Sequence, residues 1–94
     1  MKLVIDGEKV FTEKDFHDVI AKGFSLPTWY GRNLDALWDV LTGMVERPIE
    51  LIWLNSHISK ERLSRYDAII SLLKDVEKRD KDMQRTDVFT LRIE

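Results

Sequence analysis

The chain of 94 residues contains no cysteine, only two histidines and only four glycines, which are scattered. Without cysteine there is no disulfide framework and no zinc–thiolate site. The glycines form neither a Gly-x-Gly-x-x-Gly pattern nor a P-loop, and no Gly-x-Ser-x-Gly sequence occurs. The common sequence signatures of nucleotide-binding proteins and serine hydrolases are therefore missing. We predict a protein without a cofactor or a bound metal.

Long apolar stretches and a strong excess of one charge are also missing. No stretch approaches the ~20 apolar residues of a membrane-spanning helix, and the N-terminal segment becomes charged too soon for a signal peptide. The 15 basic residues are spread along the chain, and the net charge is −2. Direct binding of nucleic acid is therefore disfavoured. We expect a cytoplasmic protein of one domain, residues 1–94, that associates with no membrane.

Apolar periodicity predicts three strands and four helices in the order β-α-α-β-α-α-β. The strands are predicted at 3–5, 49–54 and 86–93, and the helices at about 13–22, 33–43, 55–63 and from 64 to a solvated turn at 79–82. Helical crossovers between strands imply a parallel sheet. The predicted fold class is therefore α/β, with three parallel strands packed with about four helices. The nearly continuous apolar run 49–54 is typical of a central strand covered on both faces.

Polar residues mark the predicted helix starts. Candidate N-cap residues are Thr12, Asn33, Asn55 or Ser56, and Ser64. Asp15 and Asp67, each three residues after a candidate cap, suggest capping boxes with Asp in place of the usual Glu.

The run from Trp29 to Asp39 gives the strongest indication of function. Asp35 and Asp39 lie four residues apart on a predicted helix, where like charges are neighbours and repel by about 0.2–0.5 kcal/mol. Folding does not require this repulsion, so the pair is a candidate for binding something cationic. Trp29, Tyr30 and Gly31 precede the helix on a loop, and Trp and Tyr are preferred anchors at protein interfaces.

Other interpretations of these residues remain open. Asp35 can serve only the helix dipole while Asp39 is merely solvated. Paired carboxylates can also perform acid–base catalysis, as in a hydrolase, but this needs a cleft that separates their pKa values. A small domain with the pair on a helix face has little room for such a cleft, and we expect no enzyme. His17 and His57 lack metal-motif spacing and are expected at the surface.

These residues resemble those of the barstar family, the intracellular protein inhibitors of barnase-type ribonucleases. The resemblance covers nearly the whole chain, and its most specific part is the pattern Leu26-Pro27-x-x-Tyr30-Gly31-x-Asn33-Leu34-Asp35-Ala36-Leu37-Trp38-Asp39. It implies a barstar-like fold and a 1:1 complex with a small secreted guanyl-specific ribonuclease. In that complex the acidic helix and the preceding loop would block the active site of the enzyme.

The resemblance also implies which residues contact the ribonuclease. Asp39 would stand where a substrate phosphate lies and accept hydrogen bonds from enzyme arginines and a histidine. Asp35 would contact basic groups near the guanine subsite, and Trp29 would pack on the catalytic histidine. Asp75 on the last helix would reach a basic residue at the rim. The remaining expected contacts complete or support this surface: Tyr30, Gly31, Asn33, Leu34 and Trp38, with Val45 and Glu46 at its border.

Three residues depart from the family pattern. Trp29 replaces a tyrosine, Arg32 stands where the best-known relative has an acid, and Asp75 is one methylene shorter than the family's glutamate. Arg32 and Arg47 are expected to weaken the local negative potential. These departures point to a partner related to, but different from, barnase. An immunity or interaction module that binds another basic nuclease toxin, or a basic protein that is not a nuclease, remains the alternative.

Overall fold

The computed structural model describes all residues from 1 to 94 and contains a three-stranded parallel sheet in the order β1-β2-β3. The strands are β1 (Lys2–Asp6), β2 (Ile49–Leu54) and β3 (Phe89–Ile93). In the register of the sheet, Leu51 lies between Leu3 and Leu91, which gives an apolar row across all three strands. The predicted α/β class and the parallel three-stranded sheet are confirmed.

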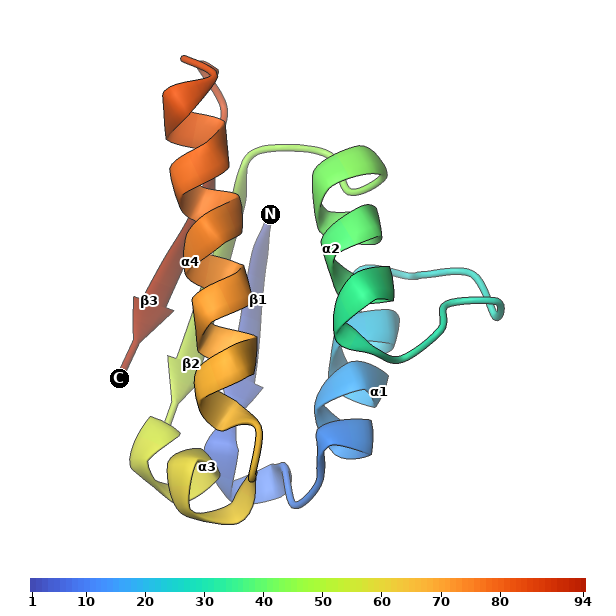
Figure 1. The fold of residues 1–94 in the computed structure, drawn as a ribbon, viewed down its shortest axis with the longest axis vertical. Helices are drawn as coiled ribbons and strands as arrows, with labels where there is room; N and C mark the ends of the chain where they lie inside the picture. Colours follow the sequence, from blue (N-terminus) through green and yellow to red (C-terminus); the bar gives the residue numbers. More distant parts are fainter.

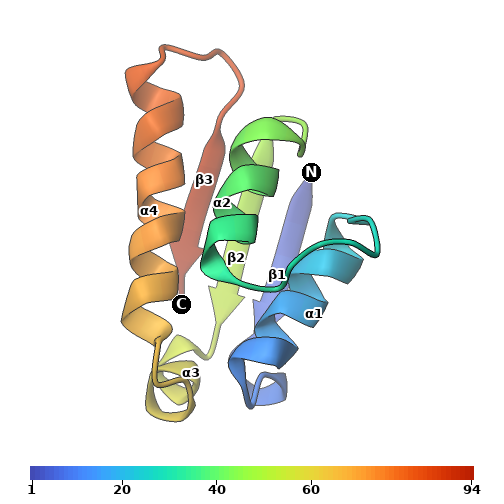
Figure 2. The same ribbon diagram turned by 45° about the vertical axis from the view of Figure 1, so that its right-hand side comes forward.

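The helices connect these strands and lie mostly on one side of the sheet. They are η1 (Gly7–Lys9), α1 (Glu13–Gly23), α2 (Leu34–Gly43), α3 (Ser56–Arg62) and α4 (Tyr66–Asp82). α4 lies in front of the strands in Figure 1, and α2 lies in front of them with α1 beside it in Figure 2. In both views α3 lies beside the end at which β2 finishes. Because the strand order is sequential and crossovers between parallel strands are right-handed, both crossovers cover the same face. No helix is both long and apolar enough to cross a membrane.

β2 is the central strand, as predicted, but helices cover only one of its faces, so the prediction of cover on both faces is wrong. The β2 side chains that face the helices are buried: Ile49, Leu51 and Trp53. On the opposite face, Ile52 lies between Val4 and Arg92 in the register. Val4 is 45% exposed there, whereas the central Ile52 is only 6% exposed. A central position between two neighbouring strands thus permits an apolar side chain even on the face without helices.

Trp53 joins four elements in the core between the sheet and the helices. Its ring stacks on Phe16 of α1 with a centroid separation of 5.2 Å, and it packs edge to face with Tyr66 of α4 at a centroid separation of 5.6 Å. Its Nε1 donates to the Ser59 hydroxyl of α3 at 2.9 Å. This bond satisfies the only polar group of a fully buried indole. The elements that carry the candidate site are therefore fixed to one well-packed core.

The starts of α1 and α2 agree with the sequence prediction. Asp15 N donates to the Thr12 hydroxyl at 3.1 Å, and the Asp15 carboxylate accepts from Thr12 N at 3.2 Å, which completes a capping box. Asn33 caps α2 by accepting from Ala36 N at 2.8 Å. These bonds satisfy N–H groups that have no partner within the helix.

α3 starts directly after Asn55, one of the two predicted cap residues, but the predicted side-chain cap bonds of α3 and α4 do not form. α4 begins at Tyr66 and has no side-chain cap, so the capping box from Ser64 to Asp67 does not form. Asn55 makes no cap bond to α3, because its side chain donates to the Asp6 carboxylate at 3.1 Å. At this position the local cap bond is replaced by a contact between the ends of β1 and β2, which are far apart in the sequence but adjacent in the sheet.

The run 79–82 is helical and not a solvated turn, since α4 continues to Asp82. Asp80 is fully buried and accepts from Arg47 Nε at 2.6 Å and from Phe89 N at 2.8 Å. Burial alone would raise the pKa of the Asp80 carboxyl, but these hydrogen bonds outweigh it and lower the pKa. Asp80 thus links α4 to the segment before β2 through Arg47 and to β3 through Phe89 N. β3 begins at Phe89, which is later than predicted.

Candidate protein-binding surface

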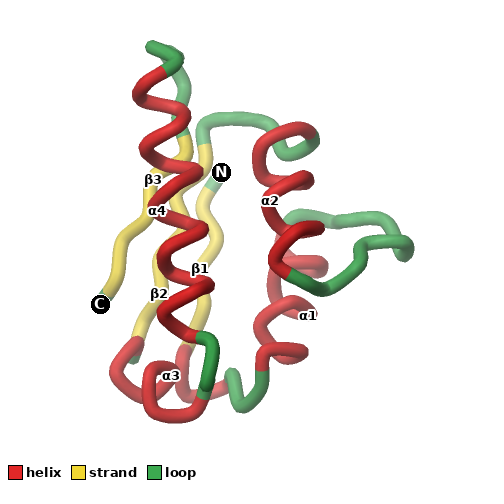
Figure 3. The backbone as a smooth tube through the Cα atoms, viewed as in Figure 1, coloured by secondary structure: helices red, strands yellow, loops and turns green.

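The loop between α1 and α2 projects away from the rest of the molecule (Figures 1 and 3). A turn within it is closed by a hydrogen bond from Tyr30 N to Pro27 O at 3.0 Å. Trp29 in this loop is 68% exposed, more than any other large apolar side chain of the protein. Packing does not account for its position, whereas an exposed indole is a preferred anchor at protein interfaces.

Asp35 and Asp39 are exposed on α2, which starts directly after the loop at the Asn33 cap. The opposite side of α2 is buried in the core through Leu37 and Leu41. Neither Asp35 nor Asp39 takes part in any salt bridge of the structure. Two adjacent carboxylates on the surface are thus left without a cationic partner.

Gly31 and Asn33 fix the junction between the loop and α2. Asn33 Nδ2 donates to Gly31 O at 3.2 Å. A Cβ at Gly31 would lie 3.2 Å from that amide and 3.3 Å from the Ala36 methyl, so a side chain there would crowd the junction. Leu34 and Trp38 are half-buried and pack against the core, and each precedes one of the two carboxylates in the sequence.

Tyr30 and His17 form a buried hydrogen-bonded pair beneath the loop. Tyr30 is 3% exposed, and its hydroxyl lies 2.7 Å from His17 Nδ1. His17 Nε2 lies 3.3 Å from Glu13 Oε2, and Arg65 binds the other Glu13 oxygen at 3.0 Å. A proton on Nε2 satisfies both contacts, since Nδ1 then accepts from the tyrosine. The Tyr30 side chain therefore supports the loop from below and has no surface for a partner.

The surface position predicted for His17 is wrong, because the ring is almost completely buried. The sequence around His17 could have indicated this burial, because residues 13, 16, 17 and 20 have the spacing of one helix face. Burial lowers the pKa of His17, although Glu13 opposes this effect. Burial also raises the pKa of Tyr30 to about 12. Both rings are therefore neutral at pH 7.

The two arginines that were expected to weaken the negative potential are both paired. Arg47 is 2% exposed and forms an ion pair with the buried Asp80. Arg32 Nε donates to Asp18 on α1 at 2.8 Å, and its Nη1 donates to Tyr30 O at 3.4 Å. The Arg32 bond also lowers the pKa of the Asp18 carboxyl. The sequence gives no local signal for either pair, because the partners are far apart along the chain.

Asp75 is exposed on α4, which lies beside α2 on the same face of the sheet (Figure 2). It borders a shallow depression of about 360 Å³ whose lining is Asp67, Ile70, Ser71, Lys74 and Asp75. Asp75 thus lies on a separate helix that neighbours α2.

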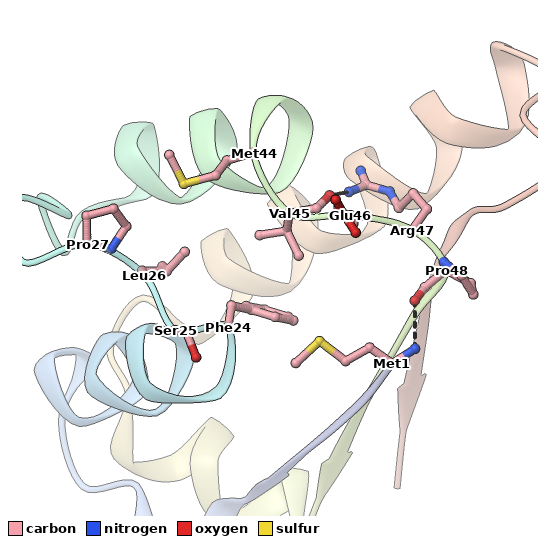
Figure 4. Close-up of a pocket in the computed structure, with 10 residues that line it drawn as sticks. All are labelled: Met1, Phe24, Ser25, Leu26, Pro27, Met44, Val45, Glu46, Arg47 and Pro48. Carbon is pink, nitrogen blue, oxygen red and sulfur yellow. Dashed lines mark hydrogen bonds between the residues drawn. The ribbon is translucent and has the colours of Figure 1, made fainter.

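A larger hollow of about 570 Å³ lies between the segments that follow α1 and α2 (Figure 4). Val45 and Glu46, expected at the border of the binding surface, are among its ten lining residues. Asp35 and Asp39 line neither this hollow nor any of the smaller ones. Acid–base catalysis by the pair would need a shared cleft, so the geometry gives that interpretation no support. No group of three or more potential metal ligands occurs.

Together, the fold and this surface define a class of small α/β protein that presents unpaired carboxylates and an exposed indole on one helix and its preceding loop. Such a surface is suited to binding a basic protein. The family model described as Barstar (barnase inhibitor) matches residues 1–93. The chain therefore belongs to the barstar family, as its sequence pattern indicated.

A protein of Bacillus subtilis (strain 168) named "Putative ribonuclease inhibitor YrdF" is 37% identical to this chain over 82 residues. The match covers 86% of this chain and 90% of that protein. The similarity therefore extends over both chains almost from end to end.

Proposed function

We propose that this protein inhibits a small, basic, guanyl-specific ribonuclease of the barnase type by covering its active site with α2 and the loop before it. The observation that carries this proposal is the unpaired pair Asp35 and Asp39 on α2, together with the exposed Trp29 in the loop before that helix. A site that cleaves RNA must bind phosphate and is therefore lined with cations. A surface with two unpaired carboxylates in a barstar-family protein is complementary to such a site.

The resemblance to the barstar family suggests a role in this complex for each residue of the surface. Asp39 replaces a substrate phosphate and accepts hydrogen bonds from the enzyme's cations, while Asp35 binds neighbouring basic groups. Trp29 covers apolar surface and the catalytic histidine, and Asp75 reaches the enzyme rim from α4. The junction and the half-buried side chains of α2 complete the contact: Gly31, Asn33, Leu34 and Trp38. Tyr30 acts from below by holding the loop in place.

The inhibitor itself performs no chemistry. It forms a 1:1 complex, without cofactor, metal or direct contact with nucleic acid, and works in the cytoplasm of the cell that makes the nuclease or meets it. The surface carboxylates would also speed association with a basic enzyme, and this gain would shrink as salt is added.

A titration of RNA cleavage by a barnase-type ribonuclease tests the proposal. Wild-type protein should abolish cleavage with a break at equimolar ratio, and Asp39→Ala should remove that break. Glu61→Ala is the matched control, because it deletes one exposed carboxylate on α3, which is not part of the proposed contact surface. Unimpeded cleavage at excess wild-type protein would contradict this choice of enzyme.

A different basic nuclease toxin is the second candidate partner. The departures from the family pattern at Trp29, Arg32 and Asp75 favour it, because all three lie on or beside the proposed contact surface. The same titration with other basic nucleases distinguishes the two candidates. Capture of a basic protein without nuclease activity would favour a general interaction module.

A further inference from the structure

Arg32 occupies an unusual position where the projecting loop joins α2. Its backbone has a φ of 49°, in the left-handed region that residues with a long side chain rarely adopt. Its side chain turns back along the loop and bonds both Asp18 of α1 and the carbonyl of Tyr30. One side chain therefore connects α1 to the loop, directly before the Asn33 cap of α2.

Asp18 is well placed to hold this arginine. It lies on α1, which is anchored in the core through Phe16 and Ile20. Its Oδ1 accepts from Arg32, while its Oδ2 accepts from Lys14 Nζ at 2.9 Å. Only the bond to Arg32 leaves α1, so Asp18 fixes the loop through this single contact.

We propose that Arg32 is a positioning residue, which holds the loop on α1 through Asp18 in the conformation that presents Trp29 and Asp35 to the partner. This proposal takes its partner from the proposed function, whereas the contacts of Arg32 are independent of that function. The buried Tyr30–His17 bond fixes the loop from inside, and Arg32 fixes it on the solvent side. A loop that is already ordered loses less conformational entropy on binding.

Charge and positioning predict opposite effects for this residue. Arg32 is a cation beside an acidic surface, so by charge alone its removal would speed association with a basic enzyme and its presence would be unfavourable. If Arg32 positions the loop, its removal loosens the bound surface and speeds dissociation. The two roles are therefore separable by measuring both rate constants.

The test compares Arg32→Gln, Asp18→Asn and the double variant in binding to a barnase-type ribonuclease. Each single variant should dissociate roughly twofold to fivefold faster, as expected for one partly exposed ion pair. The double variant should dissociate no faster than either single variant, because both remove the same contact. Lys14→Gln is the control, since it removes the other cation on Asp18 without touching the loop, and it should dissociate like wild type.

A changed association rate with an unchanged dissociation rate would overturn the proposal, because it would leave Arg32 with a charge effect only. Amide hydrogen exchange of the free protein gives a readout that needs no partner. Exchange in the segment 28–33 should accelerate in Arg32→Gln and Asp18→Asn but not in Lys14→Gln, while exchange in β2 stays the same. Equal exchange in all four proteins would also overturn it. If wild type binds no ribonuclease, the proposed function fails and the exchange measurement still decides the role of Arg32.

Discussion

Asp80 and Asp39 carry the same carboxylate but lie in opposite surroundings. Asp80 is inaccessible to solvent and accepts hydrogen bonds from Arg47 and Phe89, and Arg79 and Arg85 approach it to 3.6 and 3.9 Å. Asp39 is exposed, has no ion pair and lies one helical turn from a like charge. The chain thus compensates fully the acid that it buries and leaves uncompensated the acids that it presents.

This difference separates charges that stabilise the fold from charges that serve a partner. A buried carboxylate without donors would carry a desolvation cost of several kcal/mol, so the fold must supply cations for Asp80. An exposed carboxylate is solvated by water and needs no partner to remain charged. Leaving Asp35 and Asp39 unpaired costs the fold little and keeps their hydrogen-bonding capacity free for a basic surface.

The largest expected effect tests the buried side of the comparison. Asp80→Ala should lower the free energy of unfolding by about 3–5 kcal/mol, because Arg47 would be left buried without its anion. Urea unfolding measures this loss. Asp82→Ala is the control, since Asp82 is exposed and pairs only with Lys78 on the surface, and it should change stability by less than about 1 kcal/mol. Equal losses of stability in the two variants would contradict the view that the buried ion pair of Asp80 stabilises the fold more than a surface ion pair does.

Asp39→Ala tests the exposed side. It should weaken binding to the cognate ribonuclease by about 2–5 kcal/mol, because it leaves cations of the enzyme buried and unpaired in the complex. Isothermal titration calorimetry with Glu61→Ala as control measures this change. Wild-type affinity in Asp39→Ala would show that the exposed pair is ordinary surface charge.

The same comparison explains what sequence could predict. The strands, the caps at Thr12 and Asn33 and the exposed pair on α2 follow from periodicity and from bonds within four residues. The environment of Asp80 does not, because its partner Arg47 is 33 residues away and the run 79–82 resembles any solvated helix end. The loop before α2 was also only partly predictable. Its aromatic residues are evident from the sequence, whereas the burial of Tyr30 depends on a contact with His17 of α1.

His17 extends the comparison to a buried group that is kept neutral. Its pKa in the folded protein is lowered, chiefly by burial, below the ordinary value of 6.5. The unfolded chain therefore binds a proton that the folded protein does not, and stability should fall as pH drops below about 6.5 and towards the folded pKa. Urea unfolding between pH 7.5 and 5 measures this slope. His17→Gln should flatten it in that window, and an unchanged slope would assign it to other groups.

The smallest expected effect concerns the stability of the free protein. Asp39→Ala should raise the free energy of unfolding by about 0.2–0.5 kcal/mol, because it removes the repulsion from Asp35. Asp35→Ala should change it less, since the relief of repulsion is offset by the loss of a favourable charge in the first turn of α2. Thermal unfolding at low and high salt measures both, and the gain for Asp39→Ala should shrink at high salt as the repulsion is screened. A clear drop in melting temperature would place Asp39 with Asp80, as an acid that the fold itself requires.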